Sequence, residues 1–417
     1  MVPLLLHPRH QALGARFGEL RGRELVLGYR GGEEETLRTG AGLVDLSARE
    51  VVAVTGPDRV SFVQGMVTQD VEKLPEGGVA PAALLTAKGA MVSDARVIRL
   101  PAEVLLLVEP GFGPVVREAL QRFLISEDAE VAERSTELAQ LALVGPRAEA
   151  VVQTALGDSP AAGRAAAFDR DGISGWVLPQ GLGLPGVDVL VPVASLPKTF
   201  DRLLAAGAVP VGFEALEVLR VERGTPRFGA DLDEKTIPLE AHLQSAISYE
   251  KGCYIGQEVI ARATFRGHVN RQLVGLSFDT LPPPRTELFV GDRRVGWVTS
   301  AVQSPIFGTI GLGYAHRDVA RPGTALVLAG GAGPVTVRAL PFAANLRLSD
   351  RRPLTFGGAG CAPSTPGPRR RWRPPSRRAA SRRGNPWSPR WGSPSPRCAT
   401  SPRAPRAPPA CRPRAPG

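Results

Sequence analysis

The sequence predicts an α+β protein that closes with a small all-β unit and a Pro/Arg-rich tail. From about Gly42, strand-length apolar runs alternate with short amphipathic segments, a pattern typical of mixed α+β domains. Beyond Gly267 the helical periodicity disappears, and short β-rich runs separated by Gly, Pro and Asp turns follow. After Asp350 the composition changes abruptly to Arg, Pro, Ala, Gly and Ser. The chain of 417 residues is long enough for two or three compact domains.

The first α+β cycle follows the turn residues Thr55 to Asp58. Asp58 is expected to cap a helix in which Val60, Val63 and Val67 recur at helical spacing. The other elements predicted in this cycle are strands at Glu50–Val54, Ala83–Thr86, Ala95–Leu100 and Val104–Val108 and a helix at Pro114–Ile125.

A second cycle repeats the same alternation, which suggests two subdomains that share one architecture. Its predicted elements are strands at Leu141–Val144, Gly175–Leu178 and Val187–Val191 and helices at Ala148–Ala155 and Leu196–Ala206. A further helix, Phe213–Arg223, ends at Gly224 and Pro226.

Six short strands are predicted to close the folded part of the chain as a small barrel or sandwich. They are Gln272–Phe278, Leu288–Val290, Arg294–Val302, Thr309–Tyr314, Ala325–Leu328 and Val335–Ala339.

The net charge of +11 is unevenly distributed along the chain. Residues 351–417 contain 16 Arg, 16 Pro and no Lys, Asp or Glu, so residues 1–350 carry a net charge of −5. Such a tail cannot bury enough apolar surface to fold, and we expect it to be disordered. It is either an arginine-rich arm for an anionic partner such as nucleic acid, or a segment derived from a frameshift in GC-rich DNA. Nucleic acid is therefore an expected partner only if the tail is genuine.

Cysteine content and hydropathy favour a reducing cytoplasm. Cys253 is the one cysteine before residue 351, which excludes an intramolecular disulfide framework there. The longest apolar runs have the length of strands, so no membrane span is expected. The first thirty residues lack the apolar core of a secretory signal.

Several common site motifs are absent or out of context. The segment Gly181–Gly186 matches the dinucleotide-binding pattern of glycines, but it precedes a predicted strand and contains Pro185, so a hairpin loop is expected instead. The histidines and Cys253 lack the paired spacing of a zinc site, and no metal is expected. There is no phosphate-binding loop and no nucleophile elbow.

The segment around Cys253 carries the most specific chemical signal. Gly252 and Gly256 place the thiol on a tight loop just before a predicted helix at Gln257–Ala263. The helix dipole and nearby Lys251 would both favour the thiolate and lower the pKa of the cysteine. The alternative is a buried, inert cysteine, and the chemistry leaves both alternatives open.

The run Lys251-Gly-Cys-Tyr-Ile-Gly-Gln-Glu258 closely resembles the signature of the YgfZ family. These are folate-binding proteins related to the glycine-cleavage T-protein, and they are associated with iron–sulfur cluster assembly or repair and with tRNA modification. Further resemblances occur in the expected order at Ala261-Arg262, Phe265–Gly267, Val63–Val71, Thr86–Met91, Ile237–Ala241 and Pro341-Phe342. The resemblance covers roughly residues 40–342.

The resemblance implies two ferredoxin-like subdomains of the T-protein type and a C-terminal β-barrel around a central cavity. The expected divisions are an extension at 1–39, a folate-binding domain at 40–267 with subdomains at about 40–130 and 138–267, a barrel at 268–346 and a tail at 347–417. It also implies tetrahydrofolate as the ligand. Glu222 lies where T-proteins place their pteridine-binding glutamate, and Asp94 lies near their catalytic aspartate. Tyr254 and Arg262 are further candidates for folate contact.

The chain departs from the family in the residues expected around folate. Arg49 and Leu216 occupy places where some members have tryptophan.

Three functions remain open at this point. The leading hypothesis is a tetrahydrofolate-binding factor that supports iron–sulfur enzymes or cluster-assembly proteins and thereby tRNA modification, with Cys253 as the functional thiol beside Lys251. The enzymatic alternative is an aminomethyltransferase that moves a one-carbon unit from a lipoyl-bound aminomethyl group to folate. The third is an RNA-binding protein that uses the basic tail.

Overall fold

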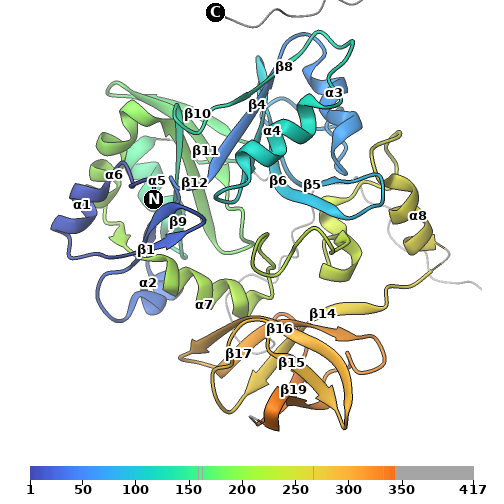
Figure 1. Ribbon diagram of the computed structural model, residues 1–417. Coiled ribbons are helices and arrows are strands. Elements are labelled where there is room, and N and C mark those ends of the chain that lie inside the picture. Colours follow the sequence, from blue (N-terminus) through green and yellow to red (C-terminus); the bar gives the residue numbers. More distant parts are fainter. Residues whose placement is uncertain (158, 162, 266, 332, 343–417) are drawn as a thin grey trace, which may run out of the picture. The chain divides into compact units, whose positions relative to one another are not determined.

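The computed structural model describes residues 1–342 except 158, 162, 266 and 332 (Figure 1). It confirms the mixed α/β class and the closed C-terminal barrel of six strands. The tail predicted from residue 347 onward lies outside the described residues.

The first forty residues form a small unit that packs on the rest of the chain. It consists of α1 (His7–Ala12), the antiparallel pair β1 (Arg16–Leu20) and β2 (Arg23–Gly28), and α2 (Glu33–Thr39). The buried ring of His10 links this unit to the next strand, because its Nε2 lies 2.8 Å from Oδ2 of Asp45 and its Nδ1 lies 2.7 Å from the hydroxyl of Tyr29.

The first large sheet has five strands in the order β5-β6-β7-β4-β8. Its strands are β4 (Glu50–Thr55), β5 (Val79–Leu85), β6 (Met91–Arg99), β7 (Glu103–Val108) and β8 (Glu130–Glu133). The helices α3 (Arg59–Met66) and α4 (Gly113–Gln121) lie beside it (Figure 1). Alternate side chains from the strands, such as Val52 and Val97, pack with Phe62 and Val116 of these helices into one apolar core.

The second sheet has six strands in the order β10-β11-β12-β9-β3-β13. Its strands are β3 (Gly42–Asp45), β9 (Leu138–Val144), β10 (Ala166–Arg170), β11 (Ile173–Pro179), β12 (Gly186–Pro192) and β13 (Val209–Pro210). The helices associated with it are α5 (Ala148–Leu156), the short η1 (Val193–Ser195) and α6 (Leu196–Ala205). Because β3 precedes the first sheet in the chain, the second sheet is built from two separate segments.

The two sheets face each other through an apolar layer. Strands of the first sheet contribute Val51, Ile98 and Leu105, and strands of the second contribute Leu178 and Leu190 to the same buried cluster. Since side chains alternate along a strand, every second residue of β6 and β7 points toward the other sheet. Polar residues at those positions must therefore lie between the sheets.

The segment after β13 connects the sheets to the barrel. It contains α7 (Phe213–Arg223), the short helices η2 (Pro238–Ala241) and η3 (Gln244–Ala246), and α8 (Gln257–Phe265). The closed barrel has the order β14-β17-β16-β15-β18-β19. Its elements are β14 (Arg271–Phe278), β15 (Glu287–Val290), β16 (Arg293–Ser304), β17 (Gly308–His316), β18 (Ala325–Leu328), η4 (Ala329–Gly331) and β19 (Pro334–Arg338).

Most of the predicted elements occur within a few residues of their expected ends, but the predicted cap of α3 was wrong. Asp58 precedes α3 as predicted, yet its side chain makes no capping hydrogen bond to the helix. Its Oδ2 instead accepts a hydrogen bond of 2.8 Å from the backbone amide of Asp128, and so ties the start of α3 to the loop before β8.

Candidate functional site

A cavity of about 260 Å³ opens between the two sheets. The first sheet contributes part of β5, the polar side of β6 and the end of β7, and the second sheet contributes the loop after β11. The connecting segment closes it with residues 225–227, 243, 245 and 246. The lining combines apolar walls such as Val79, Leu107 and Leu243 with the ionisable residues Arg49, Asp94, Arg96, Glu109 and Arg227.

Asp94 reaches this cavity because of the alternation along β6. Met91, Ser93 and Ala95 are buried on one side of the strand, so Asp94 and Arg96 point to the other side. Burial raises the pKa of the Asp94 carboxyl to about 7, and the negative charge of Glu109 acts in the same direction. The charges of Arg49 and Arg227 oppose this rise. A carboxyl group that titrates near neutral pH in a cavity is suited to proton transfer.

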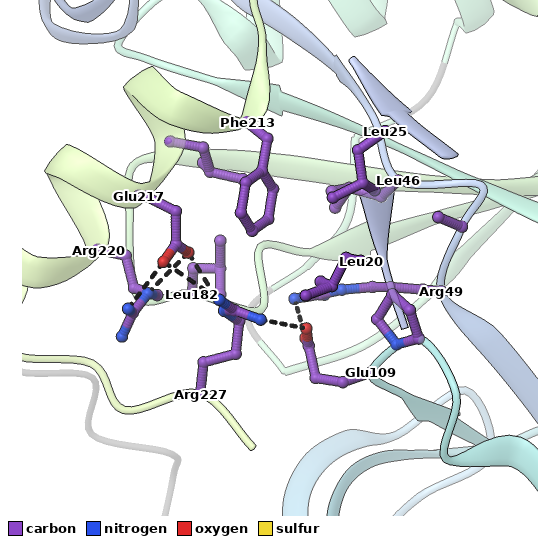
Figure 2. A pocket seen from close by; sticks show the side chains of 13 residues that line it. Leu20, Leu25, Leu46, Arg49, Glu109, Leu182, Phe213, Glu217, Arg220 and Arg227 are labelled. Atoms are coloured by element: carbon purple, nitrogen blue, oxygen red, sulfur yellow. Dashed lines mark hydrogen bonds and ion pairs between the residues drawn. The ribbon is translucent and has the colours of Figure 1, made fainter. Parts of the chain in front are cut away.

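A chain of ion pairs begins at residues that line the cavity and continues in a small adjoining pocket, which Figure 2 shows. Arg49 Nη2 lies 2.6 Å from Oε1 of Glu109, whose Oε2 lies 3.8 Å from Nη1 of Arg227. Arg227 continues to Glu217, with Nε 3.3 Å from Oε1, and Glu217 is bound by Arg220 at 2.8 Å. The alternating charges hold each of these side chains in place.

Arg96 forms the link between the two sheets at the cavity. Its guanidinium donates hydrogen bonds to Oδ2 of Asp188 on β12 and to the backbone carbonyl of Pro179. Oδ1 of Asp188 is buried and has no hydrogen-bond partner among the described residues. Asp188 is fully buried behind the cavity lining, so this interaction fixes Arg96 between the two sheets.

The glycine-rich segment Gly181–Gly186 is a hairpin loop, as predicted. It joins the antiparallel strands β11 and β12. Its first residues line the cavity together with Gln180. The side-chain nitrogen of Gln180 is buried without a hydrogen-bond partner among the described residues, so it offers a donor at the cavity.

Two residues of the Lys251–Glu258 segment, Lys251 and Gly256, have roles in packing. The Lys251 ammonium is buried and donates hydrogen bonds to the backbone carbonyls of Gln64, Val67 and Gln69 at and beyond the end of α3. Burial lowers the pKa of Lys251 to about 8, while Asp70 and Glu72 act in the opposite direction.

Gly256 allows this loop to approach the hairpin between β5 and β6. It has φ +83°, and a Cβ atom at this position would lie 2.6 Å from the carbonyl oxygen of Thr86. Both effects restrict the backbone position to glycine.

The remaining candidates in this segment do not line the cavity. Cys253 is exposed, so the alternative of a buried thiol was wrong. Tyr254 is buried in the core of the first sheet. Arg262 is exposed on α8 and pairs with Glu258. Asp94 is therefore the one sequence-based candidate that the structure places in this cavity.

Glu222 lies outside the lining of the cavity and has protein partners of its own. Its two carboxylate oxygens lie 2.6 and 2.7 Å from Nη2 of Arg38, and Oε1 accepts a hydrogen bond of 2.6 Å from the hydroxyl of Ser304. These contacts join α2, α7 and the barrel strand β16. Its expected role as a pteridine-binding residue stays a prediction.

Sequence reasoning did not select Glu109, Arg227 and Gln180 as site residues, and it noted Arg49 only as a departure from the family. Glu109 directly follows the apolar strand Glu103–Val108, and a polar residue at the end of a buried strand is a signal that could have identified it.

The described residues contain no group of three or more His, Cys, Asp or Glu side chains arranged to hold a metal ion. None of their helices has both the length and the apolar character needed to cross a membrane.

Comparisons with known proteins agree with the observed division of the chain. Residues 6–251 match the family model described as the GCVT N-terminal domain, and residues 271–343 match the glycine cleavage T-protein C-terminal barrel domain. An aminomethyltransferase of Rubrobacter xylanophilus is 35% identical over 319 residues, which cover 74% of this chain and 86% of the relative. An aminomethyltransferase of Listeria monocytogenes is 30% identical, with 76% and 89% covered.

A solved structure shows the same similarity in three dimensions. The glycine cleavage system aminomethyltransferase T of Bartonella henselae superimposes with a TM-score of 0.75 at 26% identity, covering 82% of this chain and 98% of that chain.

These findings correct the leading hypothesis drawn from the sequence. The relatives are named aminomethyltransferases, which contradicts the expected role in supporting iron–sulfur enzymes and tRNA modification. The physical reason for the error lies in the Lys251–Glu258 segment. Lys251 and Gly256 are explained by packing against α3 and the β5–β6 hairpin, so their presence does not require chemistry at the exposed thiol.

Proposed function

Because the chain belongs to the glycine cleavage T-protein family, we propose that it transfers a one-carbon unit from an aminomethyl donor to tetrahydrofolate in the cavity between the two sheets. The observation that carries the proposal is Asp94, a carboxyl group at the cavity whose pKa is raised to about 7. A single ionisable group poised near neutral pH can both accept and release the protons that this transfer requires.

The lining of the cavity supports a reduced folate as the ligand in this proposal. A pteridine is flat, and its ring presents N–H donors and a carbonyl acceptor, so it needs apolar walls together with carboxylate and amide partners. Val79, Leu107 and Leu182 supply apolar surface, and the buried nitrogen of Gln180 supplies a donor without a protein partner. Arg49, Arg96 and Arg227 give this part of the wall positive charge toward an anionic ligand.

In the proposed reaction, two protons move from the folate nitrogens to the sulfur and the amine of the donor. The methylene group leaves the sulfur and the amine of the donor and becomes bonded to two nitrogens of the folate. Each of those nitrogens loses one proton, the sulfur gains one to form a thiol, and the amine gains one to leave as ammonia, so atoms and charges balance. Asp94 acts in this scheme as the carboxylate that accepts a proton from a reacting amine.

The test is one-carbon transfer by the purified full chain. Tetrahydrofolate and an aminomethyl-dihydrolipoyl donor are supplied, and both methylene-tetrahydrofolate and ammonia are measured. Asp94→Asn should lower the rate by about 10²–10⁴-fold, the usual contribution of a general base. Asp201→Asn is the matched control, since Asp201 is exposed and pairs with Arg9 on the surface. Absence of both products with the wild-type chain would overturn the proposal.

A further inference from the structure

Asp94 lies on β6, and Glu109 directly follows β7, the antiparallel strand that pairs with β6. The ladder between β6 and β7 pairs Arg99 with Val104 and, at its other end, Arg96 with Leu107. The ladder ends there, and the same register continued by two residues would bring Asp94 and Glu109 opposite each other. Residues that face each other in this way have Cβ atoms about 5 Å apart, and like charges there repel.

The alternation of side chains brings both residues to the side of the first sheet that faces the second. Asp94 alternates with Arg96 and Ile98 along β6, and Glu109 continues the alternation of Leu105 and Leu107 just beyond the end of β7. Both residues line the same cavity. The two carboxyl groups nevertheless have unequal surroundings, because ion pairs within 4.0 Å reach Glu109 from Arg49 and Arg227, and none reaches Asp94 among the described residues.

We propose that Glu109, held beside Asp94 by its ion pairs with Arg49 and Arg227, raises the pH at which Asp94 releases its proton in the reaction proposed above. This inference rests on the proposed function for its catalytic meaning. The effect of Glu109 on the pKa of Asp94, however, depends only on the side chains of these two residues, Arg49 and Arg227.

The unequal surroundings explain why the neighbouring charge acts on Asp94. A nearby negative charge disfavours ionisation of a carboxyl group, and among the described residues no ion pair within 4.0 Å opposes this effect at Asp94. Arg49 lies 2.6 Å from Glu109 and stabilises its charge. The raised pKa of Asp94, to which burial and then Glu109 contribute, agrees with this assignment.

The other charged groups at the cavity do not replace Glu109 in this role. Arg96 is next to Asp94 on the same face, but Asp188 and the carbonyl of Pro179 hold its guanidinium. The lining residues of the second sheet, 179–183, include no ionisable side chain, and neither do the lining residues 243, 245 and 246. Glu217 is bound to Arg220 and Arg227 on the far side of the ion-pair chain.

The test measures the titration of Asp94 directly in the ligand-free full chain. Carbon-13 NMR of labelled aspartate carboxyls follows the midpoint, and the Asp94 signal is identified by its absence in Asp94→Asn. Glu109→Gln should lower the midpoint by about one pH unit or more, because it removes the nearby negative charge. Glu109→Asp keeps the charge and should restore most of the midpoint.

Two further variants make the outcome decisive. Glu103→Gln removes a carboxylate at the other end of β7, where it pairs with Arg134, and should leave the midpoint of Asp94 unchanged. Arg49→Gln should raise the Asp94 midpoint, because it removes a nearby cation that favours the ionised carboxylate. This variant keeps the test valid even if Glu109→Gln fails to fold.

The pH profile of one-carbon transfer provides the catalytic readout. Activity should fall as the pH decreases through the Asp94 midpoint, and in Glu109→Gln this limb should move to lower pH by the shift seen in the NMR titration. Unchanged Asp94 midpoints in Glu109→Gln and Arg49→Gln, or shifts opposite to those stated, would overturn the inference. A shifted NMR titration in a chain that transfers no one-carbon unit would instead overturn the proposed function alone.

Discussion

The ammonium of Lys251 donates a hydrogen bond of 2.8 Å to the backbone carbonyl of Val67, 184 residues earlier in the chain. Val67 directly follows α3, and the neighbouring carbonyls of Gln64 and Gln69 accept hydrogen bonds from the same ammonium. One buried charge therefore satisfies three backbone acceptors where a helix of the first sheet ends.

Replacing Lys251 with Met should destabilise the native state by about 2–4 kcal/mol, because buried carbonyls lose a charged donor that no water can replace at low cost. The melting temperature measures the effect. Lys73→Met is the matched control, since the Lys73 side chain is 67% exposed and its ion pairs lie at the surface. Equal melting temperatures for both variants would show that Lys251 contributes no more than a surface lysine.

The exposed thiol of Cys253 should react with an alkylating agent in the native chain about as fast as in the denatured chain. Mass spectrometry of the peptide that contains Cys253 separates its reaction from that of the cysteines after residue 351. Cys253→Ser should retain one-carbon transfer, because the thiol lies outside the lining of the cavity. A loss of transfer as large as that expected for Asp94→Asn would show that the thiol takes part in the reaction.

Asp94 should reduce stability at neutral and alkaline pH. Its native pKa of about 7 lies above the value of an unfolded aspartate, 3.8, so between these values the native state binds more protons than the unfolded state. The free energy of unfolding therefore decreases as the pH rises through this window. Below pH 4, where the Asp94 carboxyl is protonated in both states, this loss of stability is absent.

Asp94→Asn should accordingly stabilise the chain by roughly 1–2 kcal/mol at pH 8 and by much less at pH 4, after allowance for solvent screening of a partly exposed group. Thermal unfolding of both chains at the two pH values measures the difference. A stabilisation that is equal at both pH values would assign the effect to packing rather than to charge.

Glu222→Gln should lower the melting temperature, because the neutral amide weakens the contacts to Arg38 and Ser304 that join α2, α7 and β16. The expected loss is about 1–3 kcal/mol, the range for a hydrogen-bonded ion pair that is largely buried. Calorimetry with tetrahydrofolate gives a second, independent measurement. If Glu222 contacts the pteridine, Glu222→Gln should also weaken tetrahydrofolate binding by about 1–3 kcal/mol.

Much of the secondary structure could be predicted because it depends on local patterns. Helix α7, Phe213–Arg223, begins and ends at the predicted residues, since Gly224 adopts the left-handed conformation that stops it. The six barrel strands also appear in order. Strand β3, Gly42–Asp45, was missed because four buried residues show no alternation, and its place is set by pairing with β9 about a hundred residues later.

The site could be predicted only in part, for a related reason. Asp94 was selected from its place in a motif, which is local. The approach of Glu109 depends on the register of β6 against β7, and that of Arg227 on how the connecting segment returns to the cavity. Glu222 was also selected from a local motif. Its side chain, however, is bound by Arg38, which lies 184 positions away in the chain and could not be inferred from that motif.

The loop between β11 and β12 has a consequence for how this protein can diversify. It forms one wall of the cavity with residues 179–183, whereas the Asp94 and Glu109 carboxyl groups stand on the opposite sheet. Insertions or substitutions in a hairpin tip leave the ladders of both sheets intact. Substitutions at these positions can therefore change one wall of the cavity without changing the strands that carry Asp94 and lead to Glu109.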